Sequence, residues 1–164
     1  MGTGERHARC EAQLRRLLQG SPTLAFLLDA TLRAQRRTGG QTGVSYACEP
    51  CVPVRASRSD FGTRSVFLCE DAALSDTQAR HALARETLRL YDRARILLDA
   101  PGCAQLACTE VRAASLSGEC RPAAEWFRGR VGLATLRGHH SVCVRERAAA
   151  SLALAAQCAG IDVS

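Results

Sequence analysis

Residues 81–95 read HALARETLRLYDRAR, and this stretch decides how the rest of the chain is interpreted. Ser75, followed three residues later by Gln78, makes a capping box that predicts a helix beginning near residue 76. Small or apolar side chains recur at helical spacing on one face of this helix, namely Leu83, Thr87, Leu90, Ala94 and Leu97. The opposite face carries His81, Arg85, Arg89 and Asp92. Taken alone, the pattern predicts a buried stripe with a solvated polar face behind it.

Residues 106–120 read LACTEVRAASLSGEC. Together with YDRAR at 91–95, this segment resembles the zinc metalloprotease family of the mitochondrial intermembrane space that assists ATP synthase assembly. In that family a helix carries HExxHAxD, followed by an Arg and then by a segment close to ACSEIRAxxLSGxC. Tyr91, Asp92 and Arg95 fix the register between the two sequences without gaps.

The resemblance covers roughly residues 10–158 and includes a CVRxRAxxS pattern at 143–151. It implies an α+β fold: a mainly helical, zincin-like metalloprotease scaffold with a small antiparallel sheet, stapled by disulfides. The length of 164 residues suits one compact domain, so a single metalloprotease-like domain is expected over residues 1–164.

The chain departs from the family at the catalytic motif. In the shared register the family His, Glu and His fall on Arg85, Glu86 and Arg89, so the chain reads RETLR where the family reads HExxH. Two imidazoles at i and i+4 ligate zinc in HExxH, and the Glu acts on the metal-bound water. Arginine is always protonated and has no lone pair to donate. We therefore predict a degenerate site with no metal or other cofactor, and a protein that is not an enzyme.

Two further carboxylates belong to this degenerate site. Asp92 follows on the same helix, and the resemblance places Glu110 at the family's motif Glu, as a metal ligand or its support. The alternative for Glu110 is a simple ion pair with Arg112 or another arginine. Arg85 and Arg89 are expected to supply the charge that zinc supplies in active relatives, in ion pairs with these carboxylates or with Glu86.

The chain contains nine cysteines, which is dense for a cytosolic protein. They are Cys10, Cys48, Cys51, Cys69, Cys103, Cys108, Cys120, Cys143 and Cys158. All nine are candidates for structural disulfides, and the resemblance agrees, because family members are cysteine-rich and live in an oxidising compartment. Eight match family positions, while Ala94 stands at a family cysteine and Cys103 is extra. Cys103 is a candidate to replace that cysteine, and one thiol of the nine is left over. The lone CxxC at residues 48–51 keeps a redox function open, and the pairing is not set by the sequence.

Charge and hydropathy limit the partners. The net charge is +6, but all 22 basic residues are arginines spread along the chain. This dispersal argues against binding to nucleic acid and against docking on an anionic membrane. No stretch approaches the ~18 apolar residues that span a bilayer. We expect a protein peripheral to the membrane, without a transmembrane segment, and held there by a protein partner or by surface arginines.

The remaining elements are predicted from periodicity and from Gly and Pro positions. Helices besides the central one are expected at 8–19, 23–37, 104–117 and 141–158, with Trp126 in a short helix or loop. Strands are expected at 44–48, 51–55 and 64–69. A turn is expected at 57–62, and a loop at 138–140 around His139 and His140.

These observations predict a structural subunit or assembly factor of a mitochondrial inner-membrane complex, either ATP synthase or a respiratory complex. Its partners would be protein subunits of that complex, and its place the intermembrane space, peripheral to the inner membrane. Two alternatives stay open: an active metalloendopeptidase with atypical ligands, and a redox protein that uses Cys48 and Cys51.

Overall fold

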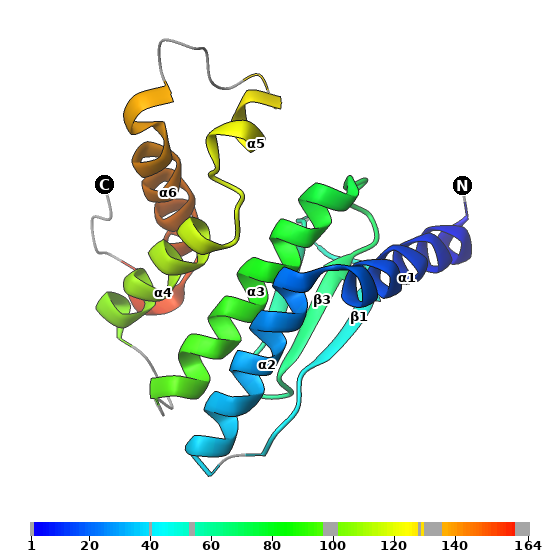
Figure 1. Ribbon diagram of the computed structural model, residues 1–164, viewed down its shortest axis with the longest axis horizontal. Helices are drawn as coiled ribbons and strands as arrows, with labels where there is room; N and C mark the ends of the chain where they lie inside the picture. Colours follow the sequence, from blue (N-terminus) through cyan, green and yellow to red (C-terminus); the bar gives the residue numbers. More distant parts are fainter. Residues whose placement is uncertain are drawn as a thin grey trace. The chain divides into compact units, whose positions relative to one another are not determined.

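The computed structural model describes residues 2–39, 41–52, 55–96, 102–127, 129 and 136–159 (Figure 1). The chain divides into two compact units, Met1–Leu97 and Leu98–Ser164. The expectation of one domain over residues 1–164 stays a prediction. The mainly helical α+β architecture with a small sheet and disulfides is confirmed.

The first unit begins with two helices, α1 (Thr3–Gly20) and α2 (Pro22–Arg37). Ser21 caps α2, because its Oγ accepts the N–H of Leu24 at 3.4 Å and Pro22 occupies the first turn. The predicted end of one helix and start of the next are thus confirmed. Helix α1 extends five residues further toward the N-terminus than the apolar pattern indicated.

The third helix, α3, spans Asp76–Ile96 and lies beside α2 (Figure 1). Its predicted capping box is present in both directions. The Ser75 N–H donates to Gln78 Oε1 at 2.9 Å, and the Gln78 N–H donates to Ser75 Oγ at 3.3 Å. These two bonds satisfy backbone donors that the first turn leaves without a helical partner.

Both faces of α3 are largely buried. Leu83, Thr87 and Leu90 of the predicted stripe are buried, while Leu97 lies outside the described residues. On the polar face, His81 is only 9% exposed and Asp92 only 3%. The polar back of this helix is therefore not a solvated face, which separates α3 from an ordinary amphipathic surface helix.

A three-stranded sheet completes the first unit, in the order β1-β3-β2. Its strands are β1 (Ser45–Glu49), β2 (Ser57–Asp60) and β3 (Ser65–Cys69). Strand β2 is antiparallel to β3, but β1 is parallel to β3. The predicted antiparallel sheet is therefore wrong in this detail: the sheet is mixed.

The second strand in chain order, β2, lies at a different place in the sequence than predicted. Strand β2 occupies part of the stretch that was expected to be a turn, and the expected strand at 51–55 is not found in its described residues, with 53 and 54 outside them. The turn comes later because the side chain of Asp60 organises it. Asp60 Oδ1 accepts the N–H groups of Gly62 at 2.8 Å and Thr63 at 3.1 Å, and Arg64 has a positive φ of 55°.

The second unit contains α4 (Cys103–Leu116), α5 (Pro122–Phe127), α6 (Leu136–Leu152) and a 3₁₀ turn, η2 (Ala156–Cys158). Helices α4 and α6 pack around a small cluster that includes Ala114 and Val144. The loop expected at 138–140 is wrong, because these residues lie in α6. His140 instead joins the two helices through Ser115 Oγ at 3.2 Å and the carbonyl of Cys120 at 3.0 Å.

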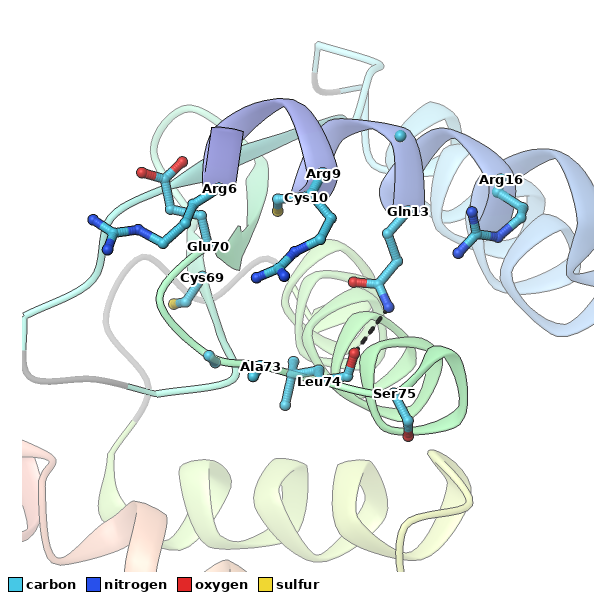
Figure 2. A pocket seen from close by; sticks show the side chains of 12 residues that line it. Arg6, Arg9, Cys10, Gln13, Arg16, Cys69, Glu70, Ala73, Leu74 and Ser75 are labelled. Atoms are coloured by element: carbon cyan, nitrogen blue, oxygen red, sulfur yellow. Dashed lines mark hydrogen bonds between the residues drawn. The ribbon is translucent and has the colours of Figure 1, made fainter. Parts of the chain in front are cut away.

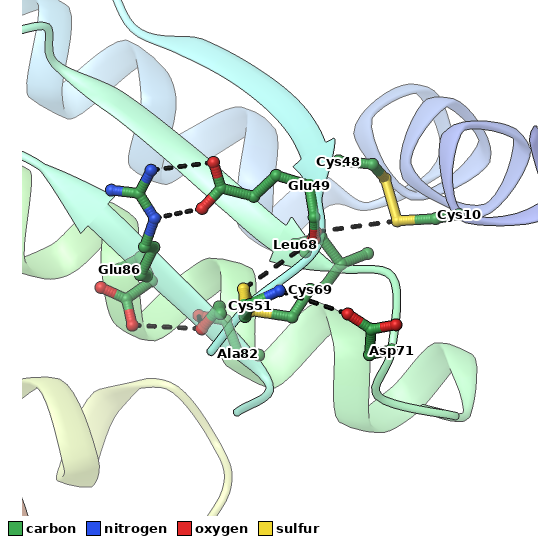
Figure 3. Close-up of a disulfide and its surroundings, with 11 residues drawn as sticks. Cys10, Cys48, Glu49, Cys51, Leu68, Cys69, Asp71, Ala82 and Glu86 are labelled. Atoms are coloured by element: carbon green, nitrogen blue, oxygen red, sulfur yellow. Dashed lines mark hydrogen bonds and ion pairs between the residues drawn. A yellow bond between two sulfur atoms is a disulfide. The ribbon is translucent and has the colours of Figure 1, made fainter. Parts of the chain in front are cut away.

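Four disulfides close the two units separately, two in each. The pairs are Cys10–Cys48, Cys51–Cys69, Cys103–Cys158 and Cys120–Cys143. Cys108 is free and exposed, so it is the thiol left over. The prediction that Cys108 is a disulfide candidate is therefore wrong. The two cysteines of the CxxC each pair with another cysteine (Figure 3), so the structure does not contain the Cys48–Cys51 disulfide that a redox protein needs.

Candidate functional site

The candidate site is built around Glu86, a carboxylate on α3 that is 2% exposed. Two hydroxyl groups of β2 donate to it, Ser57 Oγ to Oε1 at 3.1 Å and Ser59 Oγ to Oε2 at 2.7 Å. Ser57 and Ser59 point to the same side of the strand because side chains alternate along it. The strand and the helix thus meet at one buried carboxylate.

Arg89, one helical turn after Glu86, provides the positive charge. Its Nη1 donates to Glu86 Oε1 at 2.8 Å and to Oε2 at 2.9 Å. The Arg89 side chain is 16% exposed and that of Glu86 is 3% exposed, so the pair is withdrawn from water. The expected ion pair between Arg89 and Glu86 is present, and the idea that Arg89 takes the place of the zinc charge stays a prediction. A buried carboxylate needs such a partner, since desolvation penalises an isolated charge.

The neutral side of α3 is fixed to the sheet by Thr87. Its Oγ1 donates to the carbonyl of Leu83 at 2.8 Å and lies 2.9 Å from the hydroxyl of Tyr46 on β1. Burial raises the pKa of the Tyr46 phenol, which keeps it protonated as a hydrogen-bonding group. Helix α3 is therefore tied to both outer strands, to β1 through Thr87 and to β2 through Glu86.

Strand β2 lies at an edge of the sheet. The backbone N–H and C=O groups of its successive residues point alternately toward β3 and away from it. The N–H of Cys69 donates to the carbonyl of Ala56 at 3.1 Å, so residue 56 faces β3. By the alternation of an antiparallel ladder, the backbone groups of Ser57 and Ser59 then point away from β3, toward the side of β2 where no further strand pairs among the described residues. The serines that hold Glu86 by their side chains therefore offer their main chain for pairing.

The other residues of the predicted site are distributed over both units. Arg85 and the buried Asp92 lie on α3, in the same unit as Glu86. Glu110 is buried on α4 and belongs to the second unit. The structure brings together Glu86 and Arg89. The ion pairs expected for Arg85, Asp92 and Glu110 stay predictions.

The residues at the HExxH positions do not fit zinc. Arg85 and Arg89 have no lone pair to give a metal, and Glu86 already accepts hydrogen bonds from two serines and Arg89. Among the described residues, no group of three or more His, Cys, Asp or Glu side chains is placed to hold a metal ion. We accordingly derive no chemical step through zinc.

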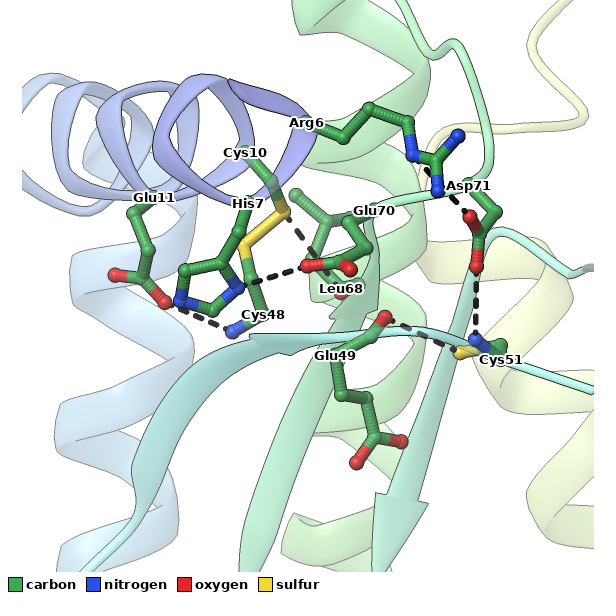
Figure 4. Close-up of polar contacts among 10 residues, drawn as sticks. All are labelled: Arg6, His7, Cys10, Glu11, Cys48, Glu49, Cys51, Leu68, Glu70 and Asp71. Carbon is green, nitrogen blue, oxygen red and sulfur yellow. Dashed lines mark hydrogen bonds and ion pairs between the residues drawn. A yellow bond between two sulfur atoms is a disulfide. The ribbon is translucent and has the colours of Figure 1, made fainter. Parts of the chain in front are cut away.

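Helix α1 is bound to the end of the sheet by charged contacts (Figure 4). His7 Nδ1 lies 2.8 Å from Glu70 Oε2, and Arg6 lies 3.6 Å from Asp71. Glu11 Oε1 accepts the backbone N–H of Cys48 at 3.0 Å, next to the disulfide that joins the same two elements. Helix α1 thus contacts the edge strand β1, whereas the other edge strand, β2, is contacted by α3.

A cleft of about 390 Å³ lies between α1 and the segment that leads into α3 (Figure 2). Two of its basic side chains, Arg6 and Arg16, form ion pairs with carboxylates. Arg16 forms a bidentate pair with Asp76, the shortest contact being 2.9 Å, and Gln13 donates to the carbonyl of Leu74 at 3.0 Å. Hydrogen bonding to Arg16, more than any other contact, lowers the pKa of Asp76. The polar groups that line this cleft mainly hold α1 against the segment that leads into α3.

Glu86 is a buried glutamate on a helix that packs against an edge strand, at the position where the sequence resemblance places the Glu of HExxH. The chain belongs to the Peptidase M76 family, which it matches over residues 8–163. It is 31% identical over 143 residues to mitochondrial inner membrane protease atp23 of Schizosaccharomyces pombe, covering 87% of this chain and 74% of that protein. Identity is 32% to the ATP23 homolog of Xenopus laevis and 31% to that of Homo sapiens. No solved structure matches.

These comparisons overturn one sequence-based prediction. The loss of both HExxH histidines led us to expect a protein that is not an enzyme. The matching family is a peptidase family and the relatives are named proteases, so that expectation is wrong. The chain spans 60% and 57% of the length of the Xenopus laevis and human relatives, about three fifths.

Two residues that contact Glu86, Ser57 and Ser59, were not among the predicted site residues. Ser57 and Ser59 were missed because their segment was expected to be a turn, although their spacing of two is the signal of one strand face. In the described part of the chain, no helix combines the length and the apolar character that crossing a bilayer requires.

Proposed function

We propose that the chain acts on protein clients at the mitochondrial inner membrane, in the processing or assembly of a complex such as ATP synthase. The relatives' names support the location and the protein substrate. The clients would be protein subunits of that complex. We further propose that an extended client segment pairs with the open edge of β2.

One observation carries the proposal: the outward-facing backbone of Ser57 and Ser59 lies on the same residues that hold Glu86. An added strand would gain main-chain hydrogen bonds at the edge, a mode that proteins use to bind extended peptides. It would at the same time pass beside the position where an HExxH peptidase has its general base. Binding and any hydrolysis are thus assigned to one place on the fold.

The disulfides support a place in the intermembrane space. Four pairs in 164 residues are typical of a protein from an oxidising compartment, because cytosolic thiols are kept reduced. A client that arrives there unfolded offers the extended backbone that an edge strand can pair with. The proposed complex is an inner-membrane complex facing this compartment.

The test uses overlapping fluorescent peptides from mitochondrial ATP synthase subunits, with the disulfide-bonded chain. Ser59→Pro removes one outward N–H from the edge, while Ser59→Ala removes only the hydroxyl contact with Glu86. At least one peptide is expected to bind, and Ser59→Pro is expected to weaken it by roughly tenfold, the value of about one hydrogen bond. Ser59→Ala is expected to bind nearly as wild type.

Mass spectrometry of the same mixtures reads out hydrolysis. Cleavage that disappears in Glu86→Gln would assign Glu86 to the chemistry. Equal binding by wild type and Ser59→Pro would show that the client is not held on β2. Absence of binding to every peptide in the set would remove ATP synthase subunits as clients.

A further inference from the structure

A second groove, of about 370 Å³, lies between α2 and the C-terminal end of α3. The two helices run side by side in the first unit (Figure 1). The groove is lined by Phe26, Arg33 and Arg37 from α2 and by Tyr91 and Arg95 from α3. It is separate from β2 and from Glu86, so it has no part in the client binding proposed above.

The α2 side of this groove is a continuous stripe. Phe26, Arg33 and Arg37 follow one another at spacings of seven and four, which places them on one helix face. The buried face of the same helix is different and includes Leu24 and Leu27. Phe26 is 70% exposed, although it is among the largest apolar side chains of the protein. A single exposed aromatic is ordinary on a protein surface, but this one lies in line with arginines, and both residue types are enriched at interfaces.

The groove has an excess of positive charge. Its lining contains three arginines but one carboxylate, Asp29, which pairs with Arg33 at 2.6 Å. Arg95 lies over the ring of Tyr91, with the guanidinium carbon 5.9 Å from its centroid. Within the residues that the structure describes, Arg37 is exposed and has no ion pair or hydrogen bond.

We propose that this groove docks the protein on a membrane surface that contains anionic phospholipids. The guanidinium groups of Arg37 and Arg95 bind headgroup phosphates, which match their planar donors. Phe26 enters the boundary between headgroups and acyl chains. Phe26 and Arg37 are eleven residues apart, or about 16 Å along the helix, so α2 lies flat on the surface.

The simpler account of these arginines is that they complement the helix dipoles, since Arg36, Arg37, Arg93 and Arg95 lie in the last turns of α2 and α3. That account explains the charge but not the exposure of Phe26. It also predicts an effect on helix stability and none on vesicle binding. The two accounts are therefore separated by measuring both quantities on the same variants.

The test is flotation with vesicles of phosphatidylcholine alone and of roughly one part phosphatidylserine to four parts phosphatidylcholine. Arg37→Gln with Arg95→Gln removes two charges from the groove. The matched control, Arg15→Gln with Arg55→Gln, removes two exposed arginines of the same unit that do not line it. We expect binding to the anionic vesicles only, and a loss of roughly 30-fold in the groove variant, about fivefold for each arginine.

The control pair is expected to bind within about twofold of wild type, and added salt to weaken all binding. Phe26→Ala is expected to lower binding at constant charge. If the groove and control variants lose vesicle binding equally, net charge alone explains the binding and the proposal is wrong. Equal binding of wild type to neutral and anionic vesicles would also overturn it. If Phe26→Ala binds the anionic vesicles as tightly as wild type, the proposed role of the aromatic side chain is wrong. Peptide binding at β2 is measured separately and is expected to be unchanged in every groove variant.

Discussion

Two arginine–carboxylate pairs of the first unit have similar geometry but different surroundings. Arg89 and Glu86 meet at 2.8 Å with side chains 16% and 3% exposed. Arg16 and Asp76 meet at 2.9 Å with side chains 61% and 52% exposed. Contact distance alone would rank them equal. Burial ranks them far apart, because water screens the outer pair and cannot replace the partner of the inner one.

The inner pair also has more neighbours that depend on it. Ser57 and Ser59 of β2 donate to the same carboxylate, so Glu86 fixes the position of an edge strand. The outer pair joins α1 to the start of α3, where Gln13 also contacts Asp76 at 2.9 Å. Loss of the inner pair should therefore affect the candidate site, and loss of the outer pair only a surface contact.

The largest effect is expected for Arg89→Met, which leaves Glu86 buried without its counter-charge. We expect a loss of about 3–5 kcal/mol in the free energy of unfolding, the usual result of removing one member of a buried pair. Urea denaturation followed by circular dichroism measures this loss. Hydrogen exchange within α3 shows whether the loss is local to the helix.

The matched control for this variant is the double change Glu86→Gln with Arg89→Met. It removes both charges, and Gln keeps an oxygen for one of the serine hydroxyls. The double variant should be more stable than Arg89→Met alone. A single variant as stable as wild type would mean that the pair is solvated and that burial does not distinguish the two pairs.

A smaller effect is expected for the neutral contact on the other side of α3. Thr87→Val keeps the shape of the side chain but removes the hydroxyl that contacts Tyr46 and Leu83. The expected loss is about 1–2 kcal/mol. Tyr46→Phe tests the same contact from the strand. If the two losses simply add in the double variant, the hydroxyls are not coupled, and Thr87 does not connect β1 to the helix.

The capping box of α3 comes next in size. Ser75→Ala removes the Oγ that accepts the N–H of Gln78 and should cost about 1 kcal/mol. Ser75→Gly should cost only a few tenths of a kcal/mol, since glycine is tolerated at this position. Equal thermal midpoints for Ser75→Ala and wild type would show that tertiary packing alone sets the start of the helix.

The sequence predicted the helices best where local chemistry decides them. The caps at Ser21 and Ser75 act within a few residues, so their signals are visible without the fold. The position of β2 was missed because the side chain of Asp60 forms the turn, and the apolar pattern does not report this. The parallel pairing of β1 with β3 depends on contacts between distant segments, which a single sequence does not specify.

The site was predictable only in part for the same reason. The register of RETLR placed Glu86 and Arg89 one turn apart, and their ion pair follows from helix geometry. The serines that complete the site come from a strand some thirty residues earlier, so they required the fold. Likewise, arginines that are dispersed in the sequence, such as Arg37 and Arg95, lie together in one groove.

The smallest effect, and the sharpest contrast with Arg89→Met, is expected for the outer pair. Hydrogen bonding to Arg16 lowers the pKa of Asp76 in the folded chain, so the pair contributes stability above the ordinary carboxyl pKa and loses it as the pH falls. Arg16→Gln should therefore differ slightly from wild type at neutral pH and low salt. The difference should vanish in acid, where Asp76 is protonated, and also at high salt, because the pair is exposed. A stability difference between Arg16→Gln and wild type that persists in acid and at high salt would mean that Arg16 acts through packing in the α1 cleft. Screening by water and salt would then not be the reason why this pair contributes less than the inner one.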